Sequence, residues 1–270
     1  MKFKKIGLVM AYETEKIIKA YDNLSEFLKQ NSVEHLVCRS LSQLVECAKQ
    51  LDVAIVVGGD GSMLAAATIA SAVKLPLIGV HYGKLGFLTD IDPSALPELM
   101  QILSGHYIKE DRAMLEISVN DDNSTHFALN EVAINRKDDS HLIAYDLYVA
   151  ANIMCAQSSD GVLIHTPTGS TAYAMSAGGP IIQPLVNTIG IVPLNPHRLN
   201  TRPIMIRNDQ IITVKLSEQT SVAVSCDGKR LQYDAVNKVT IKPAPAKLTL
   251  IHPESYDYFA RLRHKLKWEL

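Results

Sequence analysis

The spacing of apolar residues changes near Gly105, and this change constrains the fold more than any other feature of the chain. Before Gly105, short apolar runs such as "KIGLVM", "DVAIVV" and "LPLIGV" alternate with segments whose apolar residues recur every three or four positions. The short runs are typical of buried strands, and the longer spacing is typical of amphipathic helices. This alternating order predicts a parallel sheet with helices on both faces.

Beyond Gly105, short β-type runs follow one another at nearly regular spacing, separated by polar turns. This pattern predicts an all-β domain, either a sandwich or two packed sheets. The final segment has a helical pattern again and is expected to pack on the first domain. We therefore expect an α/β domain over residues 1–105, completed by 252–270, and a β-sandwich over residues 106–251. The predicted apolar contacts of the last helix are Phe259, Leu262, Leu266 and Trp268.

Composition excludes several classes of protein. The chain of 270 residues is 47% apolar and 20% charged, with a formal net charge of −1, so neither a nucleic acid nor a membrane surface is indicated as a partner. No apolar stretch approaches the length of a membrane span, and the apolar run near the N-terminus is too short for a secretory signal. Because neither a membrane span nor a secretory signal is found, we expect a cytoplasmic location. The cysteines and histidines show no metal-ligand spacing, so we expect reduced thiols and no protein-held metal site.

Residues 58–61, "GGDG", lie between an apolar strand and a helical segment. Glycines let backbone N–H groups approach a phosphate closely, especially at the start of a helix. The turn lacks the lysine and hydroxyl residue of the P-loop and does not match G-x-G-x-x-G, so an ordinary strand-to-helix turn is the alternative. Asp60 favours function, because a carboxylate beside phosphates is repelled unless a metal ion or a proton balances its charge.

Residues 158–179 join a strand to a small-residue helix through a loop rich in threonine, serine and glycine. Hydroxyl and N–H groups at a helix start form a site suited to an anion or to ribose. Tyr173, one turn into that helix, offers a flat face to a base or to a nicotinamide ring. The alternative is a turn whose hydroxyls only cap the helix, with Tyr173 in the core.

Two further segments carry residues suited to a ligand. Asn130 and Glu131 lie inside an apolar run, where an amide suits an adenine edge and a carboxylate suits sugar hydroxyls. The alternative is that both are solvated at the end of a strand. In residues 81–90, two glycines flank Lys84 beyond the fourth strand, which is where ligands lie in open α/β sheets. Phe87 either lines an adenine pocket there or belongs to the core.

Taken together, these motifs resemble the NAD kinase family, in particular its bacterial members, over nearly the whole chain. GGDG alone is a weak signal because lipid kinases and phosphofructokinases also contain it, whereas its combination with "TPTGSTAY" is highly specific. The resemblance implies a Rossmann-like N-terminal domain, a C-terminal β-sandwich and a last helix that returns to the first domain. It runs through "GGDGSML", "GKLGFLTDID", "LNEVAI", "SDGVLIHTPTGSTAYAMSAGGPI", "VSCDG" and "LIHPESYDYF".

The resemblance also implies a reaction, in which ATP phosphorylates the 2′-hydroxyl of the adenosine ribose of NAD. NAD and ATP are then substrates, Asp60 is the general base, and Mg²⁺ is held largely by the ATP phosphates. A homodimer or homotetramer is implied, because some contacts in such enzymes reach across a subunit interface. His141 is matched by spacing alone. The implied nucleotide-binding residues are Gly61, Phe87, Leu88, Asn130, Glu131, His141, Asp160, Thr171, Ala172, Tyr173, Ser176, Asp227 and Lys229.

One position departs from the family pattern. Many members have a basic residue one or two positions before the aspartate of "SDG", where this chain has Ser158. The departure puts in question the phosphate contacts that such a residue makes. Two other functions fit part of the sequence, namely a lipid kinase with the same GGDG domain and a module that senses NADP(H) without turnover. The lipid kinase is expected to lack "TPTGSTAY", and the sensor has little use for Asp60.

Overall fold

The computed structural model describes residues 1–83, 85–137, 141–217 and 221–268. The chain divides into two compact units, one of Met1–Asp111 with Ala246–Leu270 and one of Arg112–Pro245. These divisions differ from the expected ones after residues 105 and 251. The reason is that β5 (Ile108–Arg112) and β18 (Leu248–His252) add to the sheet of the first unit, which the sequence pattern did not indicate.

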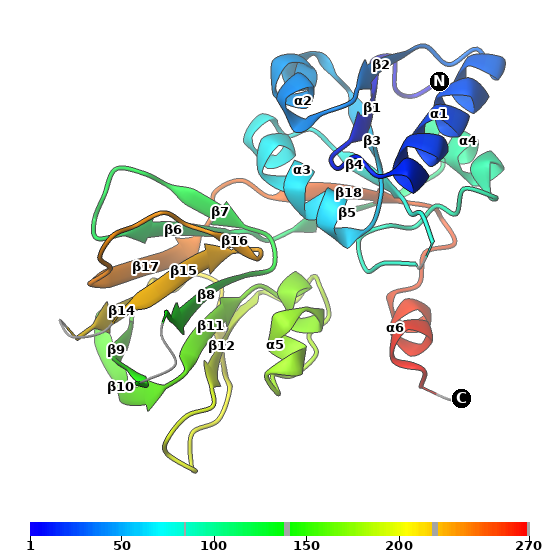
Figure 1. The fold of residues 1–270 in the computed structure, drawn as a ribbon. Helices are drawn as coiled ribbons and strands as arrows, with labels where there is room; N and C mark the ends of the chain where they lie inside the picture. Colours follow the sequence, from blue (N-terminus) through cyan, green and yellow to red (C-terminus); the bar gives the residue numbers. More distant parts are fainter. Residues whose placement is uncertain (84, 138–140, 218–220, 269–270) are drawn as a thin grey trace. The chain divides into compact units, whose positions relative to one another are not determined.

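The first unit contains one six-stranded sheet in the order β2-β1-β3-β4-β18-β5 (Figure 1). β1 pairs in parallel with β2 and β3, and β4 pairs in parallel with β3 and β18, as the alternation of strands and helices predicted. The strands not yet bounded are β1 (Ile6–Met10), β2 (His35–Cys38), β3 (Val53–Val57) and β4 (Leu77–Val80). The helices are α1 (Glu15–Gln30), α2 (Leu41–Cys47), α3 (Asp60–Val73), α4 (Leu96–Ser104) and α6 (Tyr258–Leu266), with a 3₁₀ turn at Ala48–Gln50.

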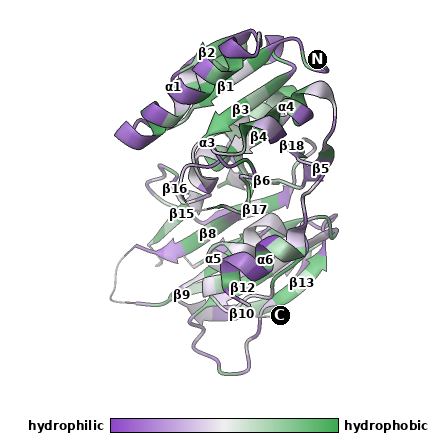
Figure 2. Ribbon diagram, turned by 90° about the vertical axis from the view of Figure 1, so that its right-hand side faces the viewer, coloured by the Kyte–Doolittle hydropathy of each residue, from purple (hydrophilic) through white to green (hydrophobic). Residues whose placement is uncertain are grey.

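Helices cover both faces of this sheet, with α1 and α4 on one face and α2 and α3 on the other (Figure 1). α1 begins after Thr14, whose hydroxyl accepts a hydrogen bond from Ile17 N at 3.3 Å, as helix N-caps do. Its residues Tyr21, Leu24 and Leu28 are buried in the core with β1 and β3. All five residues of β3 are buried, and Figure 2 shows this strand as hydrophobic. A parallel strand covered on both faces requires such a composition.

The last helix, α6, belongs to the first unit as expected, but only two of its four predicted apolar contacts, Leu262 and Leu266, are at least partly buried. Leu262 is buried, whereas Phe259 and Trp268 are each 54% exposed. The structure instead buries Arg261, which forms an ion pair with Asp90. Polar contacts therefore contribute to docking the helix together with Leu262.

The second unit contains two six-stranded antiparallel sheets, in the orders β10-β9-β14-β17-β6-β7 and β13-β12-β11-β8-β15-β16. Their facing sides share one apolar core, so the predicted sandwich is confirmed. The first sheet contains β6 (Leu115–Val119), β7 (His126–Ala128), β9 (Ile143–Val149), β10 (Asn152–Ser159), β14 (Ile212–Leu216) and β17 (Lys238–Pro243). The second contains β8 (Glu131–Arg136), β11 (Gly161–His165), β12 (Thr188–Leu194), β13 (Ile204–Arg207), β15 (Val222–Cys226) and β16 (Lys229–Arg230).

The sandwich differs from the predicted elements in two places that matter for the site. The apolar run 127–136 is two strands, β7 and β8, which lie in different sheets. The predicted small-residue helix is a 3₁₀ turn (Thr168–Thr171) followed by the single turn α5 (Tyr173–Ser176). None of the helices in the described ranges has the length and hydropathy that a membrane-spanning segment requires.

Candidate active site

The GGDG turn connects β3 to α3 in the first unit. Gly58 has a φ of +149°, and a Cβ added there overlaps Ser62 Oγ, so the fold itself requires glycine at this position. Gly61 differs, because an added Cβ meets no atom within 4 Å and its φ is not positive. The surface beside Gly61 is therefore open, with room for a ligand to approach the backbone at a helix start.

Asp60 is the first residue of α3, and two backbone N–H groups fix its carboxylate. Phe87 N donates to Oδ2 at 2.9 Å and Leu88 N donates to Oδ1 at 2.9 Å. Gly86 permits this approach, since a Cβ added there lies far inside the 3.0 Å limit of real Cβ contacts with Asp60 Oδ1. A carboxylate has about four lone-pair positions, so the half-exposed Asp60 keeps acceptor capacity for a substrate hydroxyl.

Phe87 and Leu88 are joined to Asp60 by their backbone, while their side chains lie in different environments. Leu88 is buried in the first unit, and Phe87 is half-buried, with the Lys265 ammonium 5.5 Å from its ring centre. Their place beside an adenine ring stays a prediction. Lys84, which the sequence put between two glycines near them, lies outside the described residues.

In the second unit, Asn130 lies at a corner where the chain leaves one sheet and enters the other. Backbone groups at such a corner need partners outside the strands. Asp227 accepts hydrogen bonds from the N–H groups of Leu129, Asn130 and Glu131 at 2.8, 2.7 and 3.1 Å. Thr166 Oγ1 donates to Leu129 O at 2.5 Å, and Thr166 N donates to Asn130 O at 2.9 Å. Asp227 and Thr166 therefore hold the corner that carries Asn130 and Glu131.

The Glu131 side chain is buried, and its Oε2 has no hydrogen-bond partner among the described residues. Burial, together with the charge of Asp227, raises the pKa of Glu131 to about 7. Burial also raises the pKa of Asp227, although its three N–H bonds oppose the rise. A carboxyl that is partly protonated near neutral pH both donates and accepts hydrogen bonds, which suits the hydroxyls of a ribose.

The hydroxyl groups of the "TPTGSTAY" loop bond largely within the second unit itself. Ser170 Oγ donates to Pro167 O at 2.6 Å and accepts from Ile182 N at 2.9 Å. Thr171 Oγ1 donates to Thr168 O at 3.3 Å. These hydroxyls therefore stabilise the turn of the loop itself, but neither the 3₁₀ turn nor α5 has a side-chain cap, so the capping alternative is not confirmed.

Gly169 joins this loop to the corner at Asn130. A Cβ added at Gly169 overlaps the backbone O, C and Cα of Asn130, so only glycine permits this packing. Tyr173 is 45% exposed, which contradicts the alternative that its ring belongs to the core. The other predicted contact residues of the loop are also at least partly accessible, namely Thr171, Ala172 and Ser176.

The remaining predicted site residues lie elsewhere in the second unit. Asp160 follows β10, pairs with Arg136 Nε at 3.3 Å and accepts a hydrogen bond from Asn195 Nδ2 at 2.8 Å. Lys229 is exposed in β16, and His141 is exposed between β8 and β9. Ligand binding by these three residues stays a prediction.

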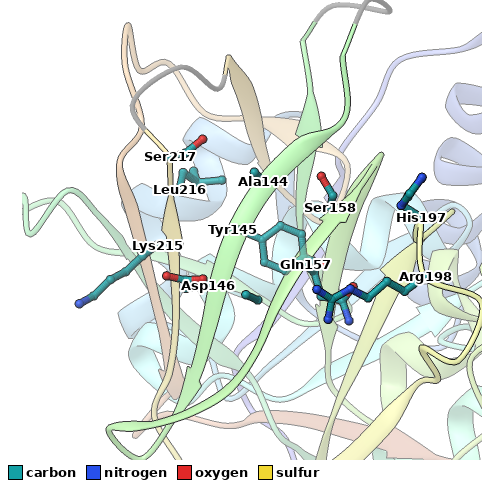
Figure 3. Close-up of a pocket in the computed structure, with 11 residues that line it drawn as sticks. Ala144, Tyr145, Asp146, Gln157, Ser158, His197, Arg198, Lys215, Leu216 and Ser217 are labelled. Atoms are coloured by element: carbon teal, nitrogen blue, oxygen red, sulfur yellow. The ribbon is translucent and has the colours of Figure 1, made fainter.

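A pocket of about 590 Å³ in the second unit contains Ser158 but none of the predicted site residues. Figure 3 shows His197 and Arg198 on the same side of this pocket as Ser158 and Gln157, with Lys215 pointing away. His197 N donates to Ser158 O at 2.9 Å. Two basic residues, His197 and Arg198, therefore line the same pocket as Ser158, which stands in place of a basic residue.

Sequence reasoning missed two buried arginines that contact predicted site segments. Arg112 Nη1 lies 3.5 Å from Thr168 Oγ1 in the second unit, and Arg261 Nη1 donates to Phe87 O at 3.2 Å in the first. In a single sequence, a buried arginine looks like any surface arginine, because its burial depends on contacts with distant segments.

Two family models match the chain. The model of the ATP-NAD kinase N-terminal domain matches residues 10–107, and the model of the ATP-NAD kinase C-terminal domain matches residues 129–252. The first match contains the GGDG turn, and the second contains the corner at Asn130 and the "TPTGSTAY" loop.

Curated relatives agree with the family models. The chain is 39% identical to the NAD kinase of Blochmanniella floridana, with 99% of this chain and 97% of the relative covered. It is 43% identical to the NAD kinase of Pseudoalteromonas translucida, with 84% and 80% covered.

Two solved structures have the same fold. Yeast NADH kinase complexed with NADH matches with a TM-score of 0.86 at 22% identity, covering 100% of this chain and 89% of that one. An NAD kinase from Archaeoglobus fulgidus in complex with ATP matches with a TM-score of 0.79 at 25% identity, covering 97% and 98%.

Proposed function

The chain belongs to the NAD kinase family, and we propose that it transfers the γ-phosphoryl group of ATP to the 2′-hydroxyl of the adenosine ribose of NAD. The bond between the γ-phosphorus and its bridging oxygen breaks, and a bond from the 2′-oxygen to that phosphorus forms. The products are ADP and NADP, and the hydroxyl proton passes to a base. The observation that carries the proposal is a fixed, half-exposed carboxylate, Asp60, in a turn whose Gly61 faces open space.

Asp60 is the base in this proposal. Its two bonds from Phe87 N and Leu88 N hold the carboxylate in one orientation and leave lone pairs for the ribose hydroxyl. Phosphoryl transfer depends mainly on positioning and on neutralising charge, so a carboxylate held by backbone groups suits this role. Gly61 then admits the phosphates of the nucleotide next to the helix start.

The second unit binds NAD in this proposal. Glu131 contacts ribose hydroxyls with a carboxyl that is partly protonated near neutral pH, and Asn130 contacts the base through its amide. The exposed ring of Tyr173 stacks on a flat ring of the dinucleotide. Asp227 holds the corner at Asn130 in this proposal, by accepting hydrogen bonds from three backbone N–H groups.

A divalent cation is part of the proposal and arrives with ATP. Within the ranges that the structure describes, no group of three or more acidic, histidine or cysteine side chains is arranged to hold a metal ion. In the proposal the cation is held largely by the ATP phosphates and by water. The cation supplies positive charge that offsets the repulsion between Asp60 and the phosphates.

Association into a homodimer or homotetramer and a cytoplasmic location are the remaining parts of the proposal. Light scattering coupled to gel filtration tests the first, since a mass of two or four chains is expected and a single-chain mass contradicts it. Cell fractionation tests the second.

The decisive assay is NADP formation by the purified protein with NAD, ATP and Mg²⁺. We expect NADP and ADP in equal amounts, and no turnover in excess chelator. Phosphate transfer to diacylglycerol or sphingosine in place of NAD would support the lipid kinase alternative. Binding of NADP without any turnover would support the sensing module.

A further inference from the structure

A buried cation of the last helix lies next to the segment that holds Asp60. Arg261 is 8% exposed, and its Nη2 pairs with Asp90 while its Nη1 donates to Phe87 O at 3.2 Å. Its guanidinium carbon lies 4.9 Å from the ring centre of Tyr256. A buried charge is costly unless it is paired and hydrogen-bonded, so these contacts fix the side chain in one position.

The partner carboxylate is equally well fixed. The side chain of Asp90 is 2% exposed, and it accepts a hydrogen bond from His252 Nδ1 at 2.7 Å as well as the bond from Arg261. Burial alone would raise the pKa of Asp90, but the bonds and charges of His252 and Arg261 hold it below its usual range. The ion pair therefore stays charged at neutral pH, and it anchors the guanidinium for its second bond, to Phe87 O.

That second bond reaches Asp60 through one peptide group. The carbonyl of Phe87 and the N–H of Leu88 belong to the same planar peptide, in which the oxygen and the hydrogen point in opposite directions. Arg261 binds the oxygen at 3.2 Å, and Asp60 Oδ1 accepts from the N–H at 2.9 Å. A positive charge on the carbonyl side polarises the peptide and strengthens its N–H as a donor.

A second contact of the same helix restrains the same segment. Lys265, one turn after Arg261, donates from Nζ to Leu85 O at 2.8 Å. On the opposite side of that peptide, Gly86 N donates to Thr89 Oγ1 at 3.2 Å. Arg261 and Lys265, one turn apart on α6, thus bind carbonyls of the segment 85–90, and this segment presents two N–H groups to Asp60.

We propose that Arg261 is a positioning residue for phosphoryl transfer, which sets the orientation of the Asp60 carboxylate through the peptide between Phe87 and Leu88. The inference rests on the proposed role of Asp60 as the base. The competing explanation is that Arg261 only docks α6 on the first unit. The two explanations predict different kinetics, because docking alone affects stability and leaves the turnover of folded protein unchanged.

The test compares Arg261→Lys with Leu262→Ala in the full-length protein. A lysine keeps the charge and pairs with Asp90, but one ammonium on a flexible stem does not reproduce the planar fork that bonds Asp90 and Phe87 O together. Leu262→Ala removes a buried apolar contact of the same helix. The measurements are Tm, kcat, and the apparent KM for NAD and for ATP, all at a temperature where both variants are folded.

We expect Arg261→Lys to lower kcat about 10-fold or more, with both KM values within threefold of wild type, since small misplacement of a catalytic group mainly slows the chemical step. Leu262→Ala is expected to lower Tm at least as much while kcat stays within twofold. Arg261→Lys with kcat within twofold, or with a loss no larger than that of Leu262→Ala, overturns the proposal.

A double-mutant cycle with Asp60→Asn separates this inference from the proposed function. If Arg261 acts through Asp60, then Arg261→Lys costs less than twofold in the residual turnover of Asp60→Asn. If Asp60→Asn is slow and Arg261→Lys adds its full 10-fold effect, the positioning role is wrong while the base assignment stands. If Asp60→Asn itself keeps wild-type turnover, both are wrong.

Discussion

Replacing Gly61 with alanine separates what the fold requires from what a ligand requires. A Cβ at this position meets no protein atom within 4 Å, and the backbone φ is not positive, so alanine fits the folded chain without strain. Gly61 lies in the first turn of α3. Alanine restricts the unfolded chain more than glycine does, and at a compatible site the exchange stabilises a protein by about 0.4–1 kcal/mol. At about 2–4 °C per kcal/mol for a chain of this size, the expected rise in Tm is about 1–4 °C.

The same methyl group is expected to impair the enzyme. It fills the open space beside the helix start, which is the space that the nucleotide phosphates occupy in the proposed function. We expect the apparent KM for ATP to rise at least about 10-fold, which corresponds to about 1.4 kcal/mol. A glycine whose replacement makes the protein more stable but weakens ATP binding serves the ligand and not the fold.

The assay combines thermal unfolding with steady-state kinetics, and Thr68→Ala is the matched control. Thr68 is exposed on the same helix, away from its first turn, so alanine there improves helix propensity without approaching the turn. The control is expected to keep both KM values. The reasoning is refuted if Gly61→Ala folds normally and its kcat and both KM values stay within twofold of wild type.

Three further predictions concern other residues of the site. Gly86→Ala is expected to lower kcat about 100-fold, because its Cβ would lie more than 1 Å inside the 3.4 Å contact distance from Asp60 Oδ1 and must displace the carboxylate; a folded variant with kcat within threefold argues against this. The pKa of Glu131 is raised from 4.5 to about 7, so the folded state binds more protons than the unfolded state between these pH values. The free energy of unfolding of wild type therefore falls by up to about 3 kcal/mol through this group as pH rises from about 4.5 to 7. Chemical denaturation across this range should show no such loss in Glu131→Gln, and parallel pH profiles would contradict the shifted pKa. Tyr173→Ala is expected to raise the KM for NAD at least fivefold and to change Tm by less than about 1 °C, since the ring is largely exposed; a large fall in Tm with unchanged KM would contradict a ligand contact.

The α/β unit was predictable because its elements are local. The apolar run of β3 and the N-cap Thr14 of α1 determine structure only a few residues away, so a single sequence is enough to recognise them. One strand that escaped prediction, β5, is almost entirely polar. β5 reads "IKEDR", and only its place beside β18 in the assembled sheet makes it a strand.

The motifs of the site were predictable, but the long-range hydrogen bonds that hold its residues in place were not. GGDG and "TPTGSTAY" are contiguous, so their chemistry is visible in the sequence. The corner at Asn130 depends on Asp227, which is 97 residues away, and the orientation of Asp60 depends on Phe87, which is 27 residues away. Such contacts form only when the chain folds, and no period or composition encodes them.

The measurement that tests the account most directly is turnover and NAD affinity in one preparation of Asp60→Asn. Asparagine keeps the shape of the side chain and removes its charge and its capacity to take a proton. Asp52→Asn is the matched control, because Asp52 also accepts two backbone N–H bonds in the first unit, from Lys4 and Lys5 at 2.8 and 2.9 Å.

We expect Asp60→Asn to lower kcat about 10²–10⁴-fold, as loss of a general base does, with an NAD dissociation constant within a fewfold of wild type. Asp52→Asn is expected to keep wild-type kcat. Turnover of Asp60→Asn within threefold of wild type would contradict the assignment of Asp60 as the base. A collapse of turnover and NAD affinity together would show that Asp60 chiefly binds substrate.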